Sequence, residues 1–296
     1  MTLSNLIGNT PLVDLSYFSP DPNRVQLYAK AEWRNPGGSL KDRPVARMLD
    51  EAVKSGALTA DKTVLDSSSG NAGISYAMIG TALGFKVNIV IPGNASTERK
   101  RRLRAHGAEL IETDPLEGYD EALRQVHALY EEQPQRFFFC DQYANRNNVL
   151  AHYEGTAGEL IRQIEGPITH FVAGVGTGGS ITGIGRRLKE TWPSVKIVAV
   201  RPQRWPGIEG LKPLGEPQDI VPKILDQGLI DRWLDVRADE AKAYCWELAR
   251  RGFFVGHSSG AYLAACVRLM SELESGIVAT LMCDIGERYF SAGLWD

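Results

Sequence analysis

The stretch N-P-G-G-S-L-K-D-R, residues 35–43, places a lysine between a tight turn and a helix. Apolar residues recur after the turn at helical spacing, at Val45, Met48, Leu49, Ala52 and Val53. Pro44 has no N–H to donate, so we expect the helix to begin between Lys41 and Arg43 and to end at Gly56. The Lys41 amine then stands at the entrance of a helix.

A helix entrance gives this amine an unusual chemical setting. Backbone N–H groups and the positive end of the helix dipole lower the pKa of an amine there and attract an anionic ligand. Such an amine suits a Schiff base with an aldehyde cofactor that carries a phosphate group. A lone lysine near a helix start is nevertheless more often a solvated surface charge, so this motif alone does not establish a function.

Three further motifs extend the pattern along the chain. They are S-S-G-N-A-G at 68–73, G-T-G-G-S at 176–180 and H-S-S-G at 257–260. Together with the lysine motif they resemble, in order and in separation, the motifs of the pyridoxal-phosphate enzymes of the tryptophan-synthase-β fold type. Within that group the chain is similar to the cysteine synthases of the B-like branch. The likeness runs from I-G-N-T-P-L at Ile7–Leu12 to G-E-R-Y-F-S at Gly286–Ser291.

Predicted strands and helices alternate along the chain, which favours an α/β fold with parallel strands and helices on both faces. Strands are expected at Val25–Lys30, Thr63–Asp66, Phe85–Ile91, Glu109–Ile111, Arg136–Cys140, His170–Val175, Val195–Val200, Phe253–Val255 and Ile277–Cys283. The resemblance implies two doubly wound, mostly parallel sheets with the active site between two lobes. The smaller lobe would comprise residues 35–145, and the larger lobe residues 1–34 and 146–296.

Composition narrows the class of protein. The 296 residues are 43% hydrophobic and 23% charged, which is ordinary for a globular chain. A net charge of −3 gives no case for nucleic acid or anionic membrane as a partner, and the basic run at 99–104 is typical of a solvated helix face. We therefore expect small molecules or further copies of this chain as partners.

Cysteine spacing and the N-terminal sequence bear on location. The cysteines are too scattered for a metal site, so none is expected, and we interpret them as reduced core residues; they are Cys140, Cys245, Cys266 and Cys283. The chain shows neither a signal-peptide pattern nor a run of about 20 apolar residues. We therefore expect a cytoplasmic protein.

A glycine-rich loop follows a predicted strand and opens a helix. It consists of Gly176, Thr177, Gly178, Gly179 and Ser180. Small residues let backbone N–H groups converge on a phosphate there, and the two hydroxyls add donors. The overlapping G-x-G-x-x-G at 174–179 also matches dinucleotide-binding sites, and Arg201 could suit NADP. That oxidoreductase alternative explains none of the other motifs, and the resemblance assigns the loop to the phosphate of pyridoxal phosphate.

A second polar loop lies at the carboxyl end of a predicted strand, where ligands bind in open α/β sheets. It consists of Ser68, Ser69, Gly70, Asn71 and Ala72. Its hydroxyls and N–H groups could bind a carboxylate, although an ordinary helix cap has the same pattern. The resemblance implies that the loop binds the substrate's α-carboxylate and that Asn71 contacts the cofactor's ring hydroxyl. The family pattern is T-S-G-N-T-G, so Ala72 lacks a hydroxyl that the family has.

Two further residues take their roles from the resemblance. Gln142 matches the glutamine that contacts the same carboxylate, and Ser258 matches the residue that hydrogen-bonds the pyridine nitrogen. A neutral hydroxyl leaves that nitrogen unprotonated, so the ring is a weaker electron sink, which favours β-elimination and replacement over transamination. Without the resemblance, Ser258 would be interpreted as a helix cap.

The resemblance implies a cysteine synthase that makes L-cysteine by β-replacement. Lys41 would hold pyridoxal phosphate and act as the general base. The activated serine would be O-acetylserine or O-phosphoserine, and the donor sulfide or another sulfur compound. Because the irregular segment Arg201–Leu229 is basic, we hypothesise that Lys212 contacts an anionic leaving group or donor; the alternative is a surface charge.

Other functions on the same fold stay open at this point. Cystathionine β-synthase, serine dehydratase and threonine synthase share the fold type, and a catalytically weak amino-acid-binding or partner-binding protein could keep the same scaffold. Relatives of this fold pair through hydrophobic faces, so a homodimer is the expected assembly.

Overall fold

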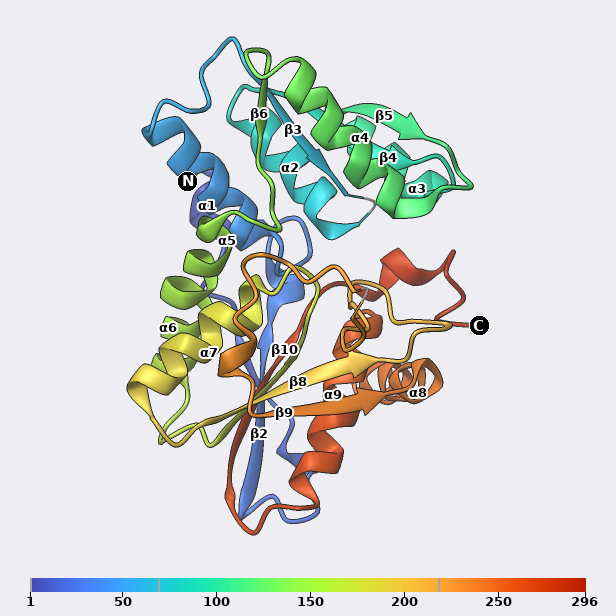
Figure 1. Ribbon diagram of the computed structural model, residues 1–296. Helices are drawn as coiled ribbons and strands as arrows, with labels where there is room; N and C mark the ends of the chain where they lie inside the picture. The colour runs from blue at the N-terminus through green and yellow to red at the C-terminus, as the bar shows by residue number, and fades with distance from the viewer. Residues whose placement is uncertain (1, 69, 218) are drawn as a thin grey trace.

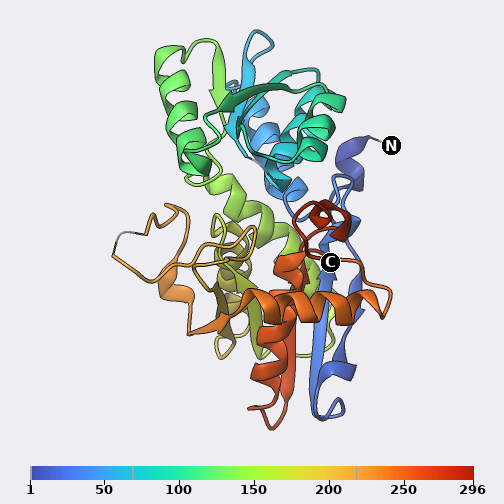
Figure 2. The same ribbon diagram turned by 90° about the vertical axis from the view of Figure 1, so that its right-hand side faces the viewer.

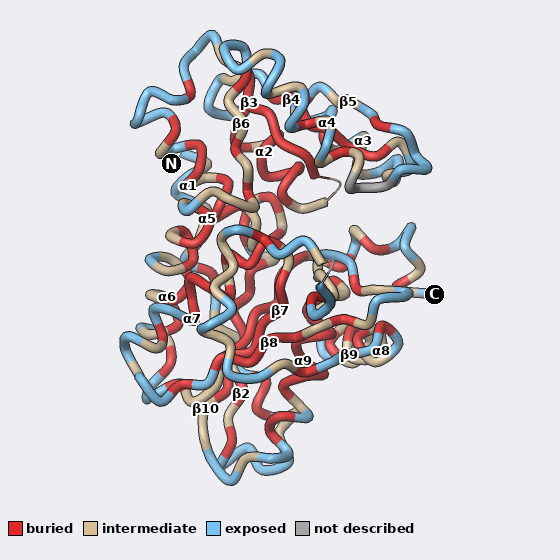
Figure 3. The backbone as a smooth tube through the Cα atoms, viewed as in Figure 1, coloured by how far each residue is buried: buried red, intermediate tan, exposed pale blue. Residues whose placement is uncertain are grey.

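The computed structural model describes residues 2–68, 70–217 and 219–296, so the prediction for Ser69 lies outside it. Within these residues the strands form two separate sheets, which Figure 1 shows one above the other. Figure 3 shows that buried residues are concentrated in the strands and inner helices, and exposed residues in the outer loops. The predicted α/β fold with two mostly parallel sheets is confirmed. The lobe boundaries at residues 35 and 145 stay a prediction.

The smaller sheet has the order β5-β4-β3-β6, with parallel neighbours throughout. Its elements are α1 Asp42–Lys54, β3 Thr63–Ser67, α2 Asn71–Ala82, β4 Lys86–Pro92, α3 Thr97–Ala105, β5 Glu109–Thr113, α4 Gly118–Glu132 and β6 Phe137–Phe139. Successive strand residues face opposite sides. Val64 packs in one cluster with α1 and α2, whereas Leu65 packs in another with α4. Helices therefore cover both faces. We call this sheet with α1–α4 the smaller lobe.

The larger sheet has the order β1-β2-β10-β7-β8-β9, and only the β1–β2 pair is antiparallel. Its strands are β1 Leu12–Asp14, β2 Val25–Ala31, β7 His170–Gly174, β8 Lys196–Pro202, β9 Arg232–Val236 and β10 Gly276–Met282. Its helices are α5 Arg146–Leu150, α6 Ala157–Gln163, α7 Gly179–Thr191, α8 Ala238–Ala249 and α9 His257–Met270. Figure 1 shows α6 and α7 on one side of it and α8 and α9 on the other. This sheet and its helices form the larger lobe.

Several local predictions were wrong. The strand expected at Phe253–Val255 is an isolated bridge from Val255 to Ile285. The backbone of this segment bonds elsewhere, because the Phe253 N–H donates to the Leu248 oxygen and the Phe254 oxygen accepts from the Gly286 N–H, each over 2.9 Å. Strands β1 and β9 lie outside the predicted set. Both are edge strands, and edge strands need no continuous apolar run. Helix α5 begins at Arg146 and continues into a π-helical turn, Ala151–Thr156.

The connection between β8 and β9 is irregular, as expected. Its described residues, 203–217 and 219–226, contain no helix or strand. Figure 2 shows this segment standing out from the side of the larger lobe, below the smaller one. We call residues 203–226 the irregular segment.

Two further observations concern the described residues. No helix among them is long and apolar enough to cross a membrane. The four cysteines are free and buried, as predicted.

Candidate active site

A cavity of about 280 Å³ is lined by loops from both lobes. Most of these loops follow the carboxyl ends of β3, β6, β7 and β10, where ligands bind in open α/β sheets. From the smaller-lobe motifs it is lined by Lys41, Ser68, Gly70, Asn71, Ala72 and Gln142. From the later motifs it is lined by Gly176, Thr177, Ser180, Lys212 and Ser258. Gly178 and Gly179 shape the loop without lining the cavity.

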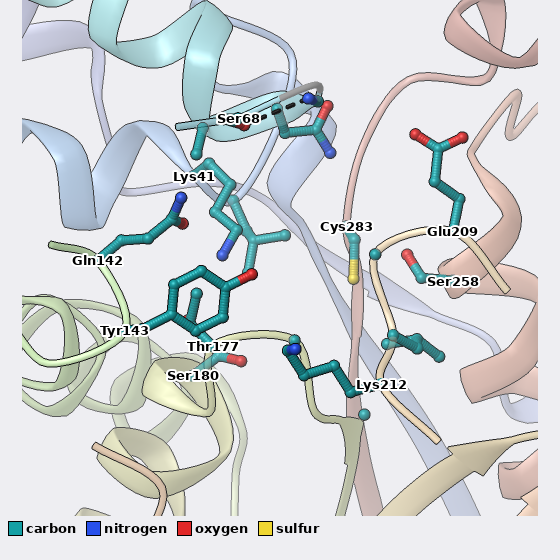
Figure 4. Close-up of a pocket in the computed structure, with 18 of the residues that line it drawn as sticks. Lys41, Ser68, Gln142, Tyr143, Thr177, Ser180, Glu209, Lys212, Ser258 and Cys283 are labelled. Atoms are coloured by element: carbon teal, nitrogen blue, oxygen red, sulfur yellow. Dashed lines mark hydrogen bonds between the residues drawn. The ribbon is translucent and has the colours of Figure 1, made fainter. Parts of the chain in front are cut away.

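Lys41 is the N-cap residue of α1, which begins at Asp42 as predicted. Gly56 follows the end of the helix with φ +72°, a backbone conformation that favours glycine. Figure 4 shows the Lys41 side chain pointing into the cavity. Burial lowers the pKa of its amine to about 8. The expected direction is right, but burial, rather than the helix N-terminus, is the main cause. Among the described residues, no hydrogen bond or ion pair engages Nζ.

A buried ion network anchors the start of α1 to the larger lobe. Arg43 pairs with Glu32 and with Glu159, both at 2.6 Å, and Lys30 pairs with Glu159 at 2.7 Å. Glu32 directly follows β2, whereas Glu159 lies in α6. Burial alone would raise the pKa of the Glu159 carboxyl, but hydrogen bonds from Arg43 and Lys30 hold it at about 2. Lys41 therefore lies two residues before Arg43, whose side chain this network holds in place.

The glycine loop leads into α7, whose first residue is Gly179. Gly178 has φ +85°, and a Cβ on Gly179 would collide with the Asn148 amide oxygen, so both positions require glycine. Asn148 Nδ2 donates to Thr177 Oγ1 over 3.0 Å and fixes that hydroxyl beside the cavity. The first N–H groups of a helix have no carbonyl partner within it. The loop can therefore surround a phosphate group with N–H and hydroxyl donors.

The predicted carboxylate loop is tied to the C-terminal part of the chain. Asn71 begins α2, and its Nδ2 donates to Asp284 Oδ2 over 2.7 Å. Its Oδ1 accepts from the Arg288 guanidinium. Across the cavity, Gln142 Nε2 donates to the backbone oxygen of Ser67 over 3.3 Å. The amides of Asn71 and Gln142 are thus held in place, and their contacts to a cofactor and a substrate stay predictions.

Ser258 lies in the first turn of α9, beside the end of β10. The Cys283 N–H donates to Ser259 Oγ over 2.9 Å, which fixes this helix start against the strand. Cys283 also lines the cavity, so its interpretation as a core residue is incomplete. Burial raises the pKa of its thiol to about 12, so the group stays protonated near neutral pH.

Lys212 reaches the cavity from the irregular segment. Its backbone N–H donates to the Val175 oxygen over 2.7 Å, which pins the segment to the end of β7. Its Nζ lies 5.4 Å from the centroid of the Tyr143 ring, at cation–π distance. Figure 4 shows both side chains on the same side of the cavity. The position suits contact with an anion, as hypothesised.

Some lining residues lie outside the predicted set: Tyr143, His152, Glu209, Tyr262, Cys283 and Tyr289. Cys283 directly follows β10, so the strand-end rule could have found it. His152 lies in the π-helical turn, where helical periodicity fails. Burial lowers the pKa of His152 to about 3, so its imidazole is neutral. Glu209 comes from an irregular segment, whose sequence has no helical or strand periodicity that would predict where its side chains lie.

This donor set fits pyridoxal phosphate. The glycine loop offers donors to the phosphate group, and Lys41 offers a buried amine to the aldehyde. Ser258 offers a neutral hydroxyl, which can serve a ring nitrogen without protonating it.

Comparison with known proteins supports pyridoxal phosphate as the cofactor. The family model described as pyridoxal-phosphate dependent enzyme matches residues 3–284. The chain therefore belongs to the family of pyridoxal-phosphate-dependent enzymes, and the predicted cofactor is confirmed.

Within this family the chain is similar to the cysteine synthases. It is 44% identical to cysteine synthase of Aquifex aeolicus (strain VF5), over 99% of this chain and 92% of that protein. It is 40% identical to cysteine synthase B of Pseudomonas aeruginosa, over 100% of this chain and 97% of that protein. The solved structure of O-acetylserine dependent cystathionine beta-synthase from Helicobacter pylori matches with a TM-score of 0.89 and 32% identity, covering 100% of this chain and 99% of that one. The expected resemblance to the B-like cysteine synthases is confirmed.

Proposed function

We propose that this protein is a cysteine synthase that converts O-acetylserine and sulfide into L-cysteine and acetate. The full-length identity of 44% to a cysteine synthase carries the proposal. The buried Lys41 amine beside a phosphate-binding loop supports it, because β-replacement needs a cofactor-binding amine that can also move a proton.

Lys41 is the residue that moves protons in this proposal. The bound cofactor would supply an electron sink for the bonds at the substrate's Cα. Nζ would hold the cofactor in the resting enzyme, and the same Nζ would take the Cα proton once the substrate is bound. Acetate leaves Cβ, the sulfide sulfur bonds to Cβ, and Nζ returns the proton to Cα. A pKa of about 8 leaves part of the amine unprotonated near neutral pH.

The polar loop before α2 and Gln142 bind the substrate's α-carboxylate in this proposal. The Ser68 hydroxyl, backbone N–H groups at the start of α2 and the Gln142 amide are the available donors, and all border the cavity. Ala72 contributes a backbone N–H but no hydroxyl. We therefore expect carboxylate binding to rely on N–H groups at this position.

Lys212 sets the preference for leaving group or donor in this proposal. Its ammonium faces the cavity over the Tyr143 ring, which leaves its charge available to a phosphate or thiosulfate. We expect O-phosphoserine and thiosulfate to depend on Lys212 more than O-acetylserine and sulfide do, because only the former pair places extra negative charge there.

The test identifies and quantifies the product by mass spectrometry. The purified holoenzyme receives O-acetylserine or O-phosphoserine with sulfide, and L-cysteine formation is quantified for the native protein and for Lys41→Ala. Lys54→Ala is the control, because Lys54 lies on the same helix with its side chain 62% exposed. We expect cysteine from native protein and Lys54→Ala only. Absence of cysteine with both substrates, together with cystathionine when homocysteine replaces sulfide, would replace this proposal with a cystathionine β-synthase.

We also propose that the chain forms a homodimer. The proposal is supported by the resemblance, because relatives of this fold pair through hydrophobic faces, and the single chain exposes large apolar side chains at Leu6 (50%), Val53 (44%) and Leu83 (45%). Light scattering during size-exclusion chromatography should give twice the chain mass of 32.6 kDa. A mass of one chain at micromolar concentration would contradict it.

A further inference from the structure

One ion pair joins the larger lobe to the smaller at the edge of the cavity. Glu209 belongs to the irregular segment and lines the cavity, and Figure 4 shows its carboxylate on the side away from Gln142 and Tyr143. It pairs with Arg99 of α3. A Cβ on Gly70 would lie 4.0 Å from Glu209 Oε1, so the carboxylate lies close to the predicted carboxylate loop.

The backbone next to Glu209 is fixed to the glycine loop. A Cβ on Gly176 would lie 2.6 Å from the Gly210 oxygen, which shows how closely the two backbones approach. Lys212 adds its hydrogen bond to Val175 at 2.7 Å. The irregular segment is therefore anchored to the larger lobe at 210–212, while Glu209 extends from this anchor to the smaller lobe.

The pair lies at the edge of the cavity and not deep within it. The Arg99 side chain is 17% exposed and that of Glu209 is 38% exposed, so solvent reaches both. The cavity of about 280 Å³ is smaller than the roughly 300–1,000 Å³ usual for ligand sites, and the cofactor must occupy part of it. Glu209 lines this cavity, so the pair fixes part of the wall that borders the space left for a nucleophile.

We propose that the Arg99–Glu209 ion pair closes the mouth of the active site and restricts the nucleophile to small thiols. The inference rests on the proposed function, because addition of the nucleophile to the substrate's Cβ is the step that it limits. Breaking the pair lets the two lobes separate at this edge and admits a bulky thiol, whose sulfur bonds to Cβ as acetate leaves.

The test compares two neutral thiols of different size, 2-mercaptoethanol and benzyl mercaptan, with O-acetylserine as co-substrate. The measured quantity is the ratio of kcat/KM for the bulky thiol to that for the small one. Glu209→Gln and Arg99→Gln should each raise this ratio by about two- to fivefold, the range expected when a partly exposed ion pair is lost. The two substitutions change the local charge in opposite directions, so a shared increase cannot come from electrostatic attraction of the thiol.

A charge-swapped double variant, Arg99→Glu with Glu209→Arg, should restore the native ratio, because the pair is re-formed with its ends exchanged. Glu272→Gln is the control, since it removes the same kind of carboxylate from an exposed pair with Arg232 elsewhere in the larger lobe. Its ratio should equal that of the native enzyme.

Hydrogen exchange gives a readout that does not depend on turnover. In the holoenzyme without substrate, amide exchange in residues 203–226 should speed up in Glu209→Gln and in Arg99→Gln, and stay native in Glu272→Gln. Equal ratios and equal exchange in all variants would overturn the inference. Opposite changes of the ratio in the two single variants would also overturn it and assign the pair an electrostatic role. Failure of the native enzyme to make cysteine from sulfide would instead reject the proposed function.

Discussion

Replacing Arg43 with methionine should destabilise the fold strongly, although Arg43 lies outside the cavity. The Arg43 side chain is 5% exposed, and its guanidinium donates to Glu32, Glu159 and Thr10. Methionine fills similar space but leaves Glu32 with only neutral donors, Thr10 and Asn35. Breaking a buried ion pair by removing one partner costs about 3–5 kcal/mol. Lys30 still neutralises Glu159, so we expect a loss within this range and not twice as large.

The loss converts into a melting temperature. An unfolding entropy of about 2.1 cal/mol/K per residue gives about 0.6 kcal/mol/K for 296 residues, so the Tm should fall by about 5–8 °C. Circular dichroism of the apoprotein at pH 7 measures it. Arg232→Met is the control, because its 44% exposed side chain pairs with Glu272 at the surface and should cost at most about 1 kcal/mol. Equal Tm shifts for the two variants would refute the buried-network argument.

Three further substitutions test separate parts of the structure. Glu159→Gln should flatten the acid branch of the stability curve: a carboxyl with a folded pKa of about 2 adds about 3 kcal/mol of stability, fully present above about pH 5 and lost as the pH falls from about 4.5 towards 2, measured by urea unfolding at each pH. Gly179→Ala should raise the Kd for pyridoxal phosphate at least about tenfold, because its Cβ meets Asn148, as titrated by absorbance; an unchanged Kd would exclude a tight loop. Lys212→Ala should raise the KM for O-phosphoserine about five- to tenfold, a loss of about 1 kcal/mol or more, with little change for O-acetylserine; unchanged kinetics with O-phosphoserine and thiosulfate would remove its role.

Local sequence features predicted the parts of the site that depend on short stretches of chain. The start of α1 after Lys41 follows from Pro44 and from the apolar spacing behind it. The glycine loop follows from Gly178 and Gly179, whose conformation and packing exclude other residues. These features were predictable because turn geometry and helix starts are set by a few neighbouring residues.

Features that depend on distant contacts were not predictable. Glu209 meets Arg99 only because an irregular segment folds back towards the smaller lobe at the edge of the cavity, and no periodic pattern marks such a segment. The pKa of Lys41 was expected to fall because of the helix N-terminus, whereas burial among residues from both lobes is the main cause. Burial of this kind is a property of the assembled lobes and cannot be read from nine residues.

The most direct test of the central claim is the visible absorption spectrum of the purified holoenzyme, recorded before and after O-acetylserine and then after sulfide. A lysine-bound cofactor should give a band that shifts with O-acetylserine and returns with sulfide, and Lys41→Ala should lack this cycle. A protein that stays colourless after incubation with pyridoxal phosphate, or a band that completes the same cycle in Lys41→Ala, would contradict the assignment of Lys41 and the cysteine synthase account built on it.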